Sequence, residues 1–339
     1  MNRDAFSARL AAIRPADAAA MDAARRRQAQ LAKPPGSLGK LEDISVQLAG
    51  ITGHIDNEIE KTRIYVLAAD NGVVAEGVSS APQSVTRQQA VNLTRGVTGA
   101  SAIARRFGDE LVVVDVGIAE DYTCPQIVNR RIARGTKNIA KEPAMTVQQA
   151  LTALDTGMTL AAQAKRDGVQ ALGVGEMGIG NTTTSAAVLM ALTGCAVEDA
   201  VGRGGGVTDE AFARKRAVVA GALARLHPDA GDAVDVLAKV GGFDLAAMAG
   251  VFLGAAESRL PVVIDGFISV VAALCAVRLC PAARDFLFAS HGSFERGYAV
   301  AAQALSLTPV LLLDMRLGEG SGCPLGFRVL EAACAAMNG

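Results

Sequence analysis

The stretch Ala171 to Ser185, ALGVGEMGIGNTTTS, passes from an apolar run through a glycine-rich loop into a polar segment. The apolar run over 171–174 predicts a short strand, and the apolar run over 186–192 predicts the body of a helix. Asn181 or Thr182 is the expected N-cap, because short polar side chains accept hydrogen bonds from the first free N–H groups of a helix. The stretch therefore predicts a strand-to-helix unit of an α/β fold.

Between the predicted strand and helix lie three glycines, Gly175, Gly178 and Gly180, and one carboxylate, Glu176. Such a loop directs backbone N–H groups and the positive end of a helix dipole to one point, which suits a phosphate. The spacing G-x-x-G-x-G differs from the dinucleotide fingerprint, and no Lys-Ser or Lys-Thr follows as in a Walker loop. If Glu176 is functional, we expect its partner to be a cation or a hydrogen-bond donor. Taken alone, the loop is equally compatible with a simple turn and a solvated Glu176.

Similar apolar runs occur along the chain, and helical patterns lie between them. Runs without polar alternation are typical of strands that are buried on both faces. The repetition of strand, polar-plus-glycine ending and helix predicts an α/β fold with a mostly parallel sheet and helices on both faces. The predicted strands are 63–69, 111–114, 171–174, 261–264, 286–289 and 310–313.

Polar side chains end or follow five of these runs. They are Asp70, Asp115, Glu176, Asp265 and His291. The carboxyl ends of parallel strands meet at one edge of a sheet, and ligands bind beyond that edge. We therefore expect these side chains to surround a pocket, although each one alone also fits a turn or a cap.

Both ends of the chain have helical patterns and no strand signal. Pro15 separates two Ala-rich helices, and the double proline within Lys33 to Gly39 interrupts the helical pattern before a third helix over 41–51. A last helix is expected from about Pro324 to Met337. The N-terminal region is thus predicted to be a helical cap or small subdomain.

A longer helix is predicted after Thr146, because Thr146 and Gln149 have the spacing of a capping box. The apolar side chains expected on its buried face are Val147, Leu151, Leu154, Met158 and Ala161.

The composition argues against several classes of partner. The chain has 339 residues, of which 50% are hydrophobic, enough for one large core or two modest ones. The formal net charge of -1 and the absence of Trp give no general attraction to nucleic acid or to an anionic membrane. The N-terminus lacks the apolar core of a signal peptide, and the most apolar span, 262–277, is too short to cross a membrane. We expect a cytoplasmic protein without a nucleic-acid or membrane partner.

The six cysteines and three histidines are dispersed along the chain. No pair has the spacing of a metal site, so we expect reduced thiols in the core and no bound metal.

Two further glycine-rich segments carry charged side chains. Val201 to Glu210 is a glycine loop followed by a helix, and Lys215 or Arg216, about two turns into that helix, is placed to reach a phosphate. The segment Met315 to Gly322, MRLGEGSG, puts Glu319 between glycines, which let the backbone approach a ligand closely. An exposed basic residue and an ordinary loop carboxylate remain the alternatives.

Seven motifs together identify a family. Besides the opening stretch they are KPPGSLGKLE (33–42), ADNGVVAEGVSSAPQSVTRQQAVN (69–92), KVGGFDLAAMAG (239–250), DGFIS (265–269), SH (290–291) and MRLGEGSG (315–322). With these motifs in one order, the chain resembles the nicotinate-nucleotide–dimethylbenzimidazole phosphoribosyltransferase family of cobalamin biosynthesis. The resemblance extends from the first helices to the last.

The resemblance implies an enzyme and its organisation. Members of the family transfer phosphoribose from nicotinate mononucleotide to 5,6-dimethylbenzimidazole, giving α-ribazole 5′-phosphate and nicotinate with inversion at the anomeric carbon. The implied partners are these small molecules and a second copy of the chain in a homodimer, and no cofactor is needed. The implied division is a small helical domain of 1–58 and 323–339 and a large Rossmann-like domain of 59–322.

The resemblance also assigns roles residue by residue. Glu319 matches the catalytic carboxylate, a general base that takes the azole N–H proton. Lys215 matches a phosphate-binding lysine, and Gln89 and Leu317 match the pocket of the benzimidazole. The other residues implied in substrate binding are Glu176, Gly178, Gly180, Asn181, Thr182, Ser290 and Asp265.

Two other functions fit parts of the pattern. A non-catalytic module that binds a nucleotide or phosphate for regulation needs Glu176, the glycine loops and Lys215, but it does not need Glu319. A nicotinamide-dependent oxidoreductase is disfavoured because the dinucleotide spacing is not met.

Overall fold

The computed structural model describes residues 1–339 and contains one sheet of six strands in the order β3-β2-β1-β4-β5-β6. Every neighbouring pair of strands is parallel, which confirms the predicted sheet. The strands are β1 (Thr62–Ala69), β2 (Glu110–Gly117), β3 (Val128–Asn129), β4 (Ala171–Met177), β5 (Val262–Ile264) and β6 (Leu287–Ala289).

Five predicted strands are present, but the one expected over 310–313 is wrong. In that segment only Leu311 makes a bridge, to His291. Pro309 has no N–H to extend a ladder, and the side chain of Leu312 is 83% exposed, so this apolar run is not buried like a strand. The remaining strand, β3, has only two residues and gives no apolar signal in the sequence.

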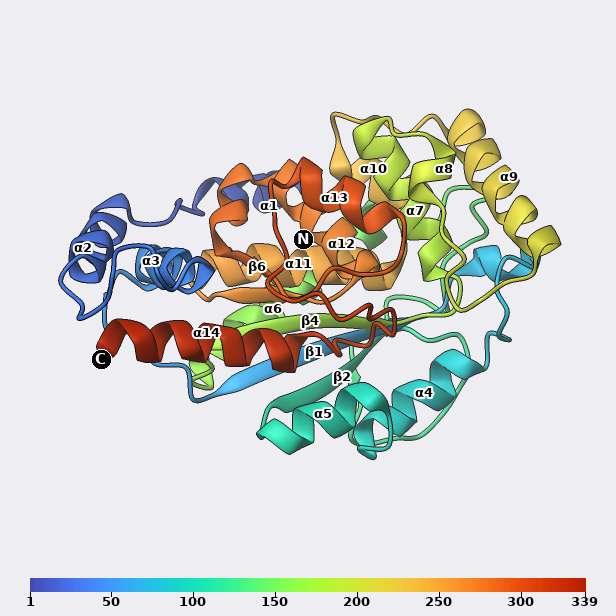
Figure 1. Ribbon diagram of the computed structural model, residues 1–339. Coiled ribbons are helices and arrows are strands. Elements are labelled where there is room, and N and C mark those ends of the chain that lie inside the picture. Colours follow the sequence, from blue (N-terminus) through green and yellow to red (C-terminus); the bar gives the residue numbers. More distant parts are fainter.

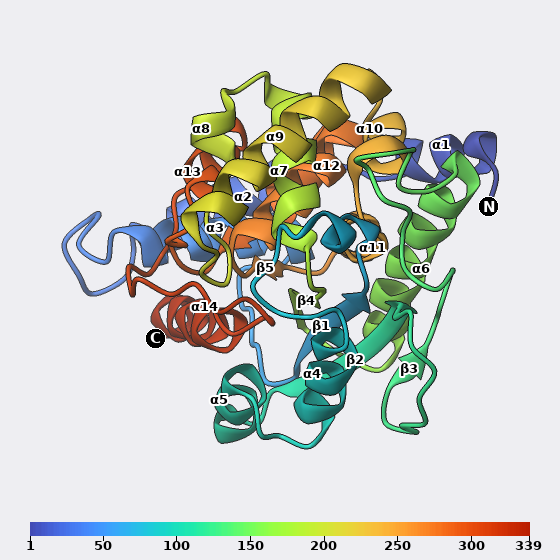
Figure 2. The same ribbon diagram turned by 90° about the vertical axis from the view of Figure 1, so that its right-hand side faces the viewer.

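Helices cover both faces of the sheet (Figures 1 and 2). On one face α4 and α5 pack against β2, and α14 packs against β4 and β5. On the other face α11 packs against β1, β2 and β4, α12 lies beside it, and α6 packs against α11. The α-helices are α1 (Arg3–Ala11), α2 (Ala18–Gln28), α3 (Lys40–Thr52), α4 (Val85–Thr94), α5 (Gly99–Phe107), α6 (Val147–Arg166), α7 (Asn181–Thr193), α8 (Val197–Ala200), α9 (Asp209–Leu226), α10 (Ala233–Val240), α11 (Phe243–Glu257), α12 (Phe267–Leu279), α13 (Gly297–Ala304) and α14 (Cys323–Asn338), with 3-10 turns η1 (Gly72–Glu76) and η2 (Pro281–Phe286).

The helices α6 and α11 approach each other with almost no space between their backbones. A Cβ atom on Gly157 would lie 2.0 Å from the carbonyl oxygen of Ala247, and one on Gly250 would lie 2.1 Å from that of Leu154. Glycine is therefore the residue that permits this contact. The predicted capping box of Thr146 and Gln149 is present at the start of α6.

The predicted buried face of α6 is correct except at its first residue. Leu151, Leu154, Met158 and Ala161 are buried, whereas Val147 is 39% exposed. Val147 occupies the first helical position, where the helix has not yet reached the core.

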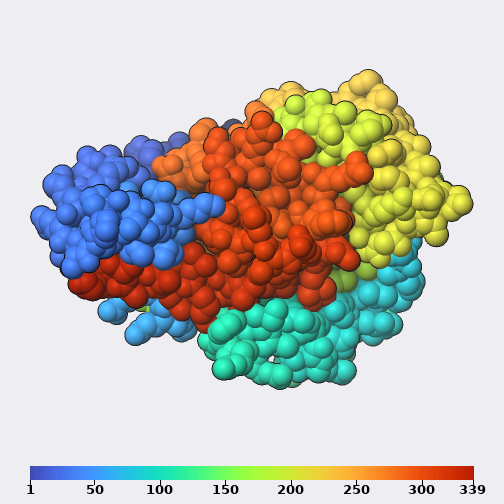
Figure 3. All heavy atoms as spheres, in the orientation of Figure 1, coloured from blue at the N-terminus to red at the C-terminus, as the bar shows by residue number.

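The helices α2 and α3 and the last helix, α14, meet at one end of the molecule (Figures 1 and 3). A small hydrophobic cluster joins Ala24 of α2, Val46 and Ala49 of α3, and Met337 of α14. The first helix lies elsewhere, because Arg9 of α1 donates to Glu257 of α11 and Asp155 of α6. None of the helices combines the length and the apolar character that a membrane crossing requires.

The order of the strands fixes where a ligand can bind. From β1 the chain passes to β2 on one side, and after α6 it returns to β4 on the other side of β1. The loops that leave β1 and β4 therefore diverge, and such a switch point opens a crevice at the carboxyl edge. Glu176 near the end of β4 lies at this edge, and residues 178–180 connect the strand to α7.

Candidate functional site

A cavity of about 230 Å³ lies at the carboxyl edge of the sheet. It is formed by the loop before α4, the β4–α7 connection, the glycine loop before α9, and the segments after β5, after β6 and before α14. The sequence-predicted residues that line it are Glu176, Gly178, Gly180, Asn181, Thr182, Lys215, Asp265, His291, Leu317 and Glu319.

Glu319 is a buried carboxylate with one satisfied and one free oxygen. Its residue is 6% exposed, its Oε1 accepts a hydrogen bond of 2.7 Å from Gln89 Nε2, and its Oε2 is buried without a partner. Burial raises the pKa of Glu319, while the hydrogen bond from Gln89 lowers it. The result is a carboxylate held by one oxygen and able to accept a proton through the other.

Glu176 has the hydrogen-bond donor that the sequence led us to expect. Asn181 Nδ2 donates to Glu176 Oε2. It also donates to Asp244 Oδ2, at a distance of 2.9 Å. Burial raises the pKa of Glu176 to about 8 and that of Asp244 to about 6, because both carboxyl groups lie out of water. Glu176 Oε1 also lies against Gly318, where an added Cβ would come within 2.5 Å of it.

Asn181 itself is not the N-cap of α7. The N-cap position is Gly180, with a φ of +92°, and Asn181 is the first helical residue. This corrects the predicted cap: the Asn181 side chain points back to two carboxyl groups, so it is not available to cap the helix.

The glycines of the same connection allow close contact with β1. A Cβ on Gly178 would lie 2.4 Å from the carbonyl oxygen of Ala69 and 2.7 Å from Asp244 Oδ2. The strand β4 continues to Met177, so Gly175 and Glu176 belong to the strand and the loop is shorter than predicted.

Lys215 is a buried cation at the glycine loop. Its Nζ donates to Thr182 Oγ1 at 2.8 Å and to the carbonyl oxygen of Gly202 at 3.1 Å, and the residue is 1% exposed. Burial lowers the pKa of Lys215 to about 8, against the opposing charge of Glu295. Gly204 lies beside it, because a Cβ there would be 3.5 Å from Nζ. An ammonium group beside a turn of glycines is suited to a phosphate.

The remaining predicted site residues have different places. Leu317 lines the cavity and is 52% exposed. Gln89 of α4 does not line the cavity, but it donates a hydrogen bond to Glu319, which does. Ser290 does not line the cavity; its hydroxyl lies 3.1 Å from His291 Nδ1 and 3.3 Å from the carbonyl oxygen of Asp265.

Asp265 is buried and its carboxylate oxygens both accept from the protein's own backbone. Gly320 N donates to Oδ2 at 2.9 Å and Gly322 N donates to Oδ1 at 2.7 Å. Burial raises the pKa of Asp265, while His291 and the two N–H groups act in the opposite direction. The hydrogen bonds of Asp265 thus connect β5 to the segment that carries Glu319.

Asp70 and Asp115 lie at the predicted edge but do not line the cavity. Asp70 Oδ2 accepts from Ala119 N at 2.8 Å. Asp115 accepts from the N–H groups of Gly117 and Ile118 and forms an ion pair with Arg131. These two carboxylates stabilise loops, which agrees with the alternative that they form turns or caps.

Two carboxylates at or beside the cavity were not predicted. Asp244 shares Asn181 with Glu176, and the sequence signal for it is its place in the first turn of a helix after Gly241-Gly242. Glu295 lines the cavity, and a Cβ on Gly202 would lie 1.8 Å from its Oε2. Nothing in the sequence around Glu295 indicates this, because only the fold brings the segment after β6 to the glycine loop.

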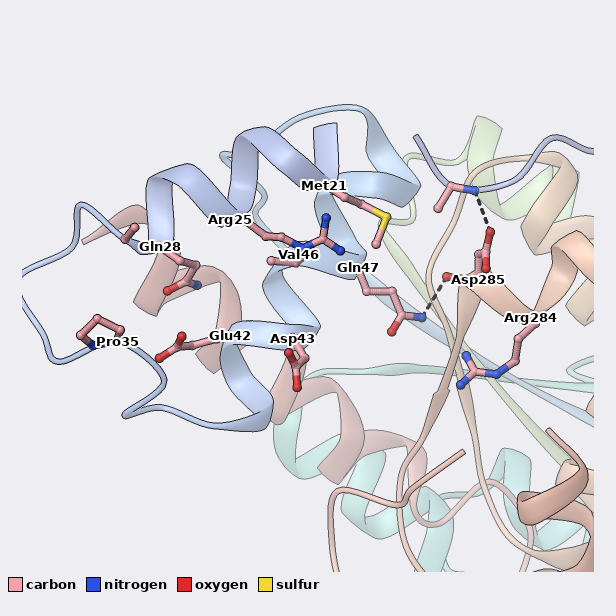
Figure 4. A pocket seen from close by; sticks show the side chains of 12 residues that line it. Met21, Arg25, Gln28, Pro35, Glu42, Asp43, Val46, Gln47, Arg284 and Asp285 are labelled. Atoms are coloured by element: carbon pink, nitrogen blue, oxygen red, sulfur yellow. Dashed lines mark hydrogen bonds between the residues drawn. The ribbon is translucent and has the colours of Figure 1, made fainter. Parts of the chain in front are cut away.

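A larger cavity, of about 590 Å³, lies between α2, α3 and η2 (Figure 4). Asp285 on its wall accepts from Ala16 N and, through its carbonyl oxygen, from Gln47 Nε2, both at 2.9 Å. Asp285 precedes β6, so this cavity lies at the amino edge of the sheet, away from Glu319 and Lys215.

The cavity at the carboxyl edge combines three chemical capacities. Lys215 and the glycine loop can hold an anion, Glu176 and Asn181 can bind hydroxyl groups, and Glu319 can accept a proton from a group placed between them. This combination fits a reaction in which a phosphorylated sugar is held while a second, protonated nucleophile attacks it.

The chain is similar to known phosphoribosyltransferases. A family model described as phosphoribosyltransferase matches residues 13–339. A Clostridium perfringens protein named nicotinate-nucleotide–dimethylbenzimidazole phosphoribosyltransferase is 52% identical over 93% of this chain and 87% of its own length. An Acetivibrio thermocellus protein of the same name is 49% identical over 92% and 89%. The crystal structure of CobT from Thermus thermophilus superposes with a TM-score of 0.91 at 44% identity, covering 94% of this chain and 96% of that one.

Proposed function

The chain belongs to the nicotinate-nucleotide–dimethylbenzimidazole phosphoribosyltransferase family, and from this premise we propose that the cavity at the carboxyl edge is its active site. The reaction transfers phosphoribose from nicotinate mononucleotide to 5,6-dimethylbenzimidazole. The products are α-ribazole 5′-phosphate and nicotinate, with inversion at the anomeric carbon.

The observation that supports this proposal most strongly is the free oxygen of Glu319. One azole nitrogen attacks the anomeric carbon, and the proton on the other nitrogen passes to Glu319 Oε2, which has no partner within the protein. Gln89 fixes Oε1, so the free oxygen keeps one orientation. General-base help of this kind contributes roughly 10²–10⁴-fold to the rate.

The leaving group needs little assistance. The pyridinium of nicotinate mononucleotide carries a positive charge, and breaking its bond to the anomeric carbon returns an electron pair that neutralises the ring nitrogen. No acid is needed at that nitrogen. Positive charge develops on the sugar ring in the transition state, and the nearby carboxyl groups of Glu319 and Glu176 favour it to the extent that they are ionised.

Lys215 and the glycine loop before α9 bind the 5′-phosphate in this proposal. The ammonium group gives a charge-assisted hydrogen bond, and Gly204 lets the backbone come close to the phosphate oxygens. The Ser80 hydroxyl donates to the carbonyl oxygen of Gly205 at 3.3 Å, so the loop before α4 contacts the glycine loop at the wall of the cavity. Both reactants are thereby brought within reach of Glu319.

We also propose that the protein acts as a cytoplasmic homodimer with the small helical and large α/β domains that the resemblance implies. Exposed apolar side chains support an interface: Phe294 is 68% exposed, Leu312 83%, Leu313 51% and Leu317 52%. Phe294 N donates to the carbonyl oxygen of Met315, so two of the segments that carry them lie side by side.

The test is to incubate the protein with nicotinate mononucleotide and 5,6-dimethylbenzimidazole and to measure free nicotinate and the new riboside phosphate by chromatography. Both products should appear in equal amounts and only when both reactants are present. Binding without any product would support the regulatory module instead.

The assignment of the base is tested with Glu319→Gln. The amide oxygen of the new side chain can still accept from Gln89, but the group cannot take a proton. We expect kcat to fall by about 10²–10⁴-fold with both substrates still bound. Glu142→Gln, at an exposed position, is the matched control and should turn over normally. Normal turnover in Glu319→Gln would refute the base assignment.

A further inference from the structure

The backbone that carries Glu319 has an unusual conformation. Gly318, Glu319 and Gly320 have φ values of +80°, +61° and +80°, so three consecutive residues lie in the left-handed region. Glycine adopts this region freely, but a side chain such as that of Glu319 is strained there. Such a conformation persists only where the surroundings enforce it, and it is often found at functional sites.

The carboxylate of Asp265 provides one of these restraints. Its two oxygens accept from Gly320 N at 2.9 Å and from Gly322 N at 2.7 Å, so they hold the chain directly after Glu319. Asp265 is 1% exposed and follows β5 immediately, which anchors the contact to the sheet. These hydrogen bonds involve a buried charged acceptor, and they are therefore stronger than those between neutral groups.

Packing behind the segment limits the alternatives that it can adopt. A Cβ on Gly175 of β4 would lie 2.2 Å from Gly320 N, so the segment is in direct contact with the strand. A Cβ on Gly322 would lie 2.3 Å from His291 Nδ1, and that nitrogen lies 4.0 Å from Asp265 Oδ1. The segment is therefore held by Asp265 and supported by β4 and His291.

We propose that Asp265 is a positioning residue of the reaction, whose carboxylate holds the backbone of Gly320 and Gly322 so that Glu319 keeps its place in the wall of the cavity. This inference rests on the proposed role of Glu319 as the general base. It replaces the direct substrate contact that the resemblance implied for Asp265, because both carboxylate oxygens are already bound to backbone N–H groups.

The test is a double-mutant cycle of Asp265→Asn and Glu319→Gln. The Asn side chain has nearly the same shape, but it has only one acceptor oxygen and its NH2 group faces an N–H donor. We expect Asp265→Asn to lower kcat by about 10²-fold, as a small misplacement of a catalytic group does, and to change the KM for nicotinate mononucleotide less than about threefold. In the Glu319→Gln background the same change should lower the residual rate less than about threefold, because the base that it positions is already gone.

Asp115→Asn is the matched control. Asp115 is also a buried carboxylate at the end of a strand and also accepts from two backbone N–H groups, but it does not contact the Glu319 segment. We expect its kcat to stay within about threefold of the wild type. If Asp265→Asn does not fold, Asp265→Ser replaces it in the double-mutant cycle. The Ser side chain is smaller and keeps one acceptor, and we expect the same pattern of kcat values.

Each other result would count against the inference. Equal losses of kcat with and without Glu319→Gln would show that Asp265 acts independently of the base. A raised KM with an unchanged kcat would show direct substrate binding by Asp265. If the wild type is active and Glu319→Gln is not, an unchanged kcat in Asp265→Asn refutes the positioning role alone, whereas an inactive wild type refutes the proposed function.

Discussion

Lys215 is a residue whose charge depends on pH within the working range. Its buried ammonium has a pKa of about 8, below the ordinary value of 10.5, so it is charged below about pH 8 and neutral above. A phosphate monoester becomes a dianion above about pH 6. The KM for nicotinate mononucleotide should thus be lowest between about pH 6 and 8 and should rise above that range as Lys215 loses its proton.

Replacing Lys215 by Met tests this dependence. Loss of a charge-assisted hydrogen bond costs about 1.5–3 kcal/mol, which corresponds to a KM roughly 10- to 150-fold higher, with a smaller change in kcat. The rise in KM above pH 8 should also disappear. Lys141→Met, at an exposed position, is the control. An unchanged KM in Lys215→Met would argue against the phosphate role.

Glu176 makes stability depend on pH in a predictable direction. Its pKa is raised from 4.5 to about 8 by burial, so between these values the folded protein keeps a proton that the unfolded chain releases. The contribution of Glu176 to stability is therefore complete below about pH 4.5 and is lost as the pH rises to about 8. Gln cannot ionise and can still accept from Asn181.

We therefore expect Glu176→Gln to unfold at a higher temperature than the wild type at pH 9, with the difference shrinking toward zero at pH 5. Thermal unfolding followed by circular dichroism at pH 5, 7 and 9 measures it. Glu142→Gln, exposed to solvent, should show no such trend. A difference that is constant across the three pH values would show that ionisation of Glu176 is not its cause.

At the scale of residues, the sequence predicted which side chains lie at the carboxyl edge better than it predicted their contacts. Glu176, Asp265 and His291 line the cavity because each follows or ends a parallel strand. The N–H groups that bind Asp265 lie more than fifty positions away in the sequence, and Glu295 comes close to the glycine loop before α9 only in the folded chain. Such long-range contacts leave no periodic pattern in the sequence.

At the scale of elements, the contact between α6 and α11 gives a sharp prediction. Ala at position 157 would place its Cβ 2.0 Å from the carbonyl oxygen of Ala247, so the helices must separate. Gly157→Ala should lower the free energy of unfolding by about 1–3 kcal/mol through overpacking. Gly221→Ala, in α9 with no atom within 4 Å of the added Cβ, should instead raise it by about 0.5–1 kcal/mol. Urea denaturation measures both, and equal effects would contradict the role of the close contact.

The sequence predicted a strand correctly where a long run of apolar residues is buried. The strand β1 is buried at every position, and its apolar run predicted a strand that is buried on both faces. The run over 310–313 is also apolar but is exposed at Leu312 and Leu313, so apolar composition alone does not determine burial. The two residues of β3 are too few for a pattern, and only pairing with β2 makes them a strand.

At the scale of the whole molecule, the exposed apolar side chains near the cavity predict the effect of a charge on assembly. Leu312 is 83% exposed, and an Asp there should weaken the proposed homodimer at least tenfold, because a charge would lose its hydration at the interface. Sedimentation velocity over a range of protein concentrations measures this. Val147→Asp changes an exposed apolar residue at the start of α6, where an acid is favourable, and should leave assembly unchanged. A Leu312→Asp protein that sediments like the wild type would exclude Leu312 from the interface.

The overall architecture was predictable because alternation of strands and helices leaves few arrangements for a parallel sheet. The division into a small and a large domain stays a prediction. The packing of α2, α3 and α14 on one another is consistent with it, whereas α1 packs on α6 and α11. The sequence gives no signal for this difference, because all of these segments show only a helical pattern.

The two outermost strands of the sheet are very short, and this has a consequence for handling the protein. β3 has two residues and β6 has three, and beside β6 the N–H groups of Val310 and Leu311 already bind the carbonyl oxygens of Ala289 and Ser290. A foreign strand finds few unpaired backbone groups to join. Fibril-like precipitation on heating should consequently begin from unfolded chains, so that its onset follows the melting transition and does not precede it.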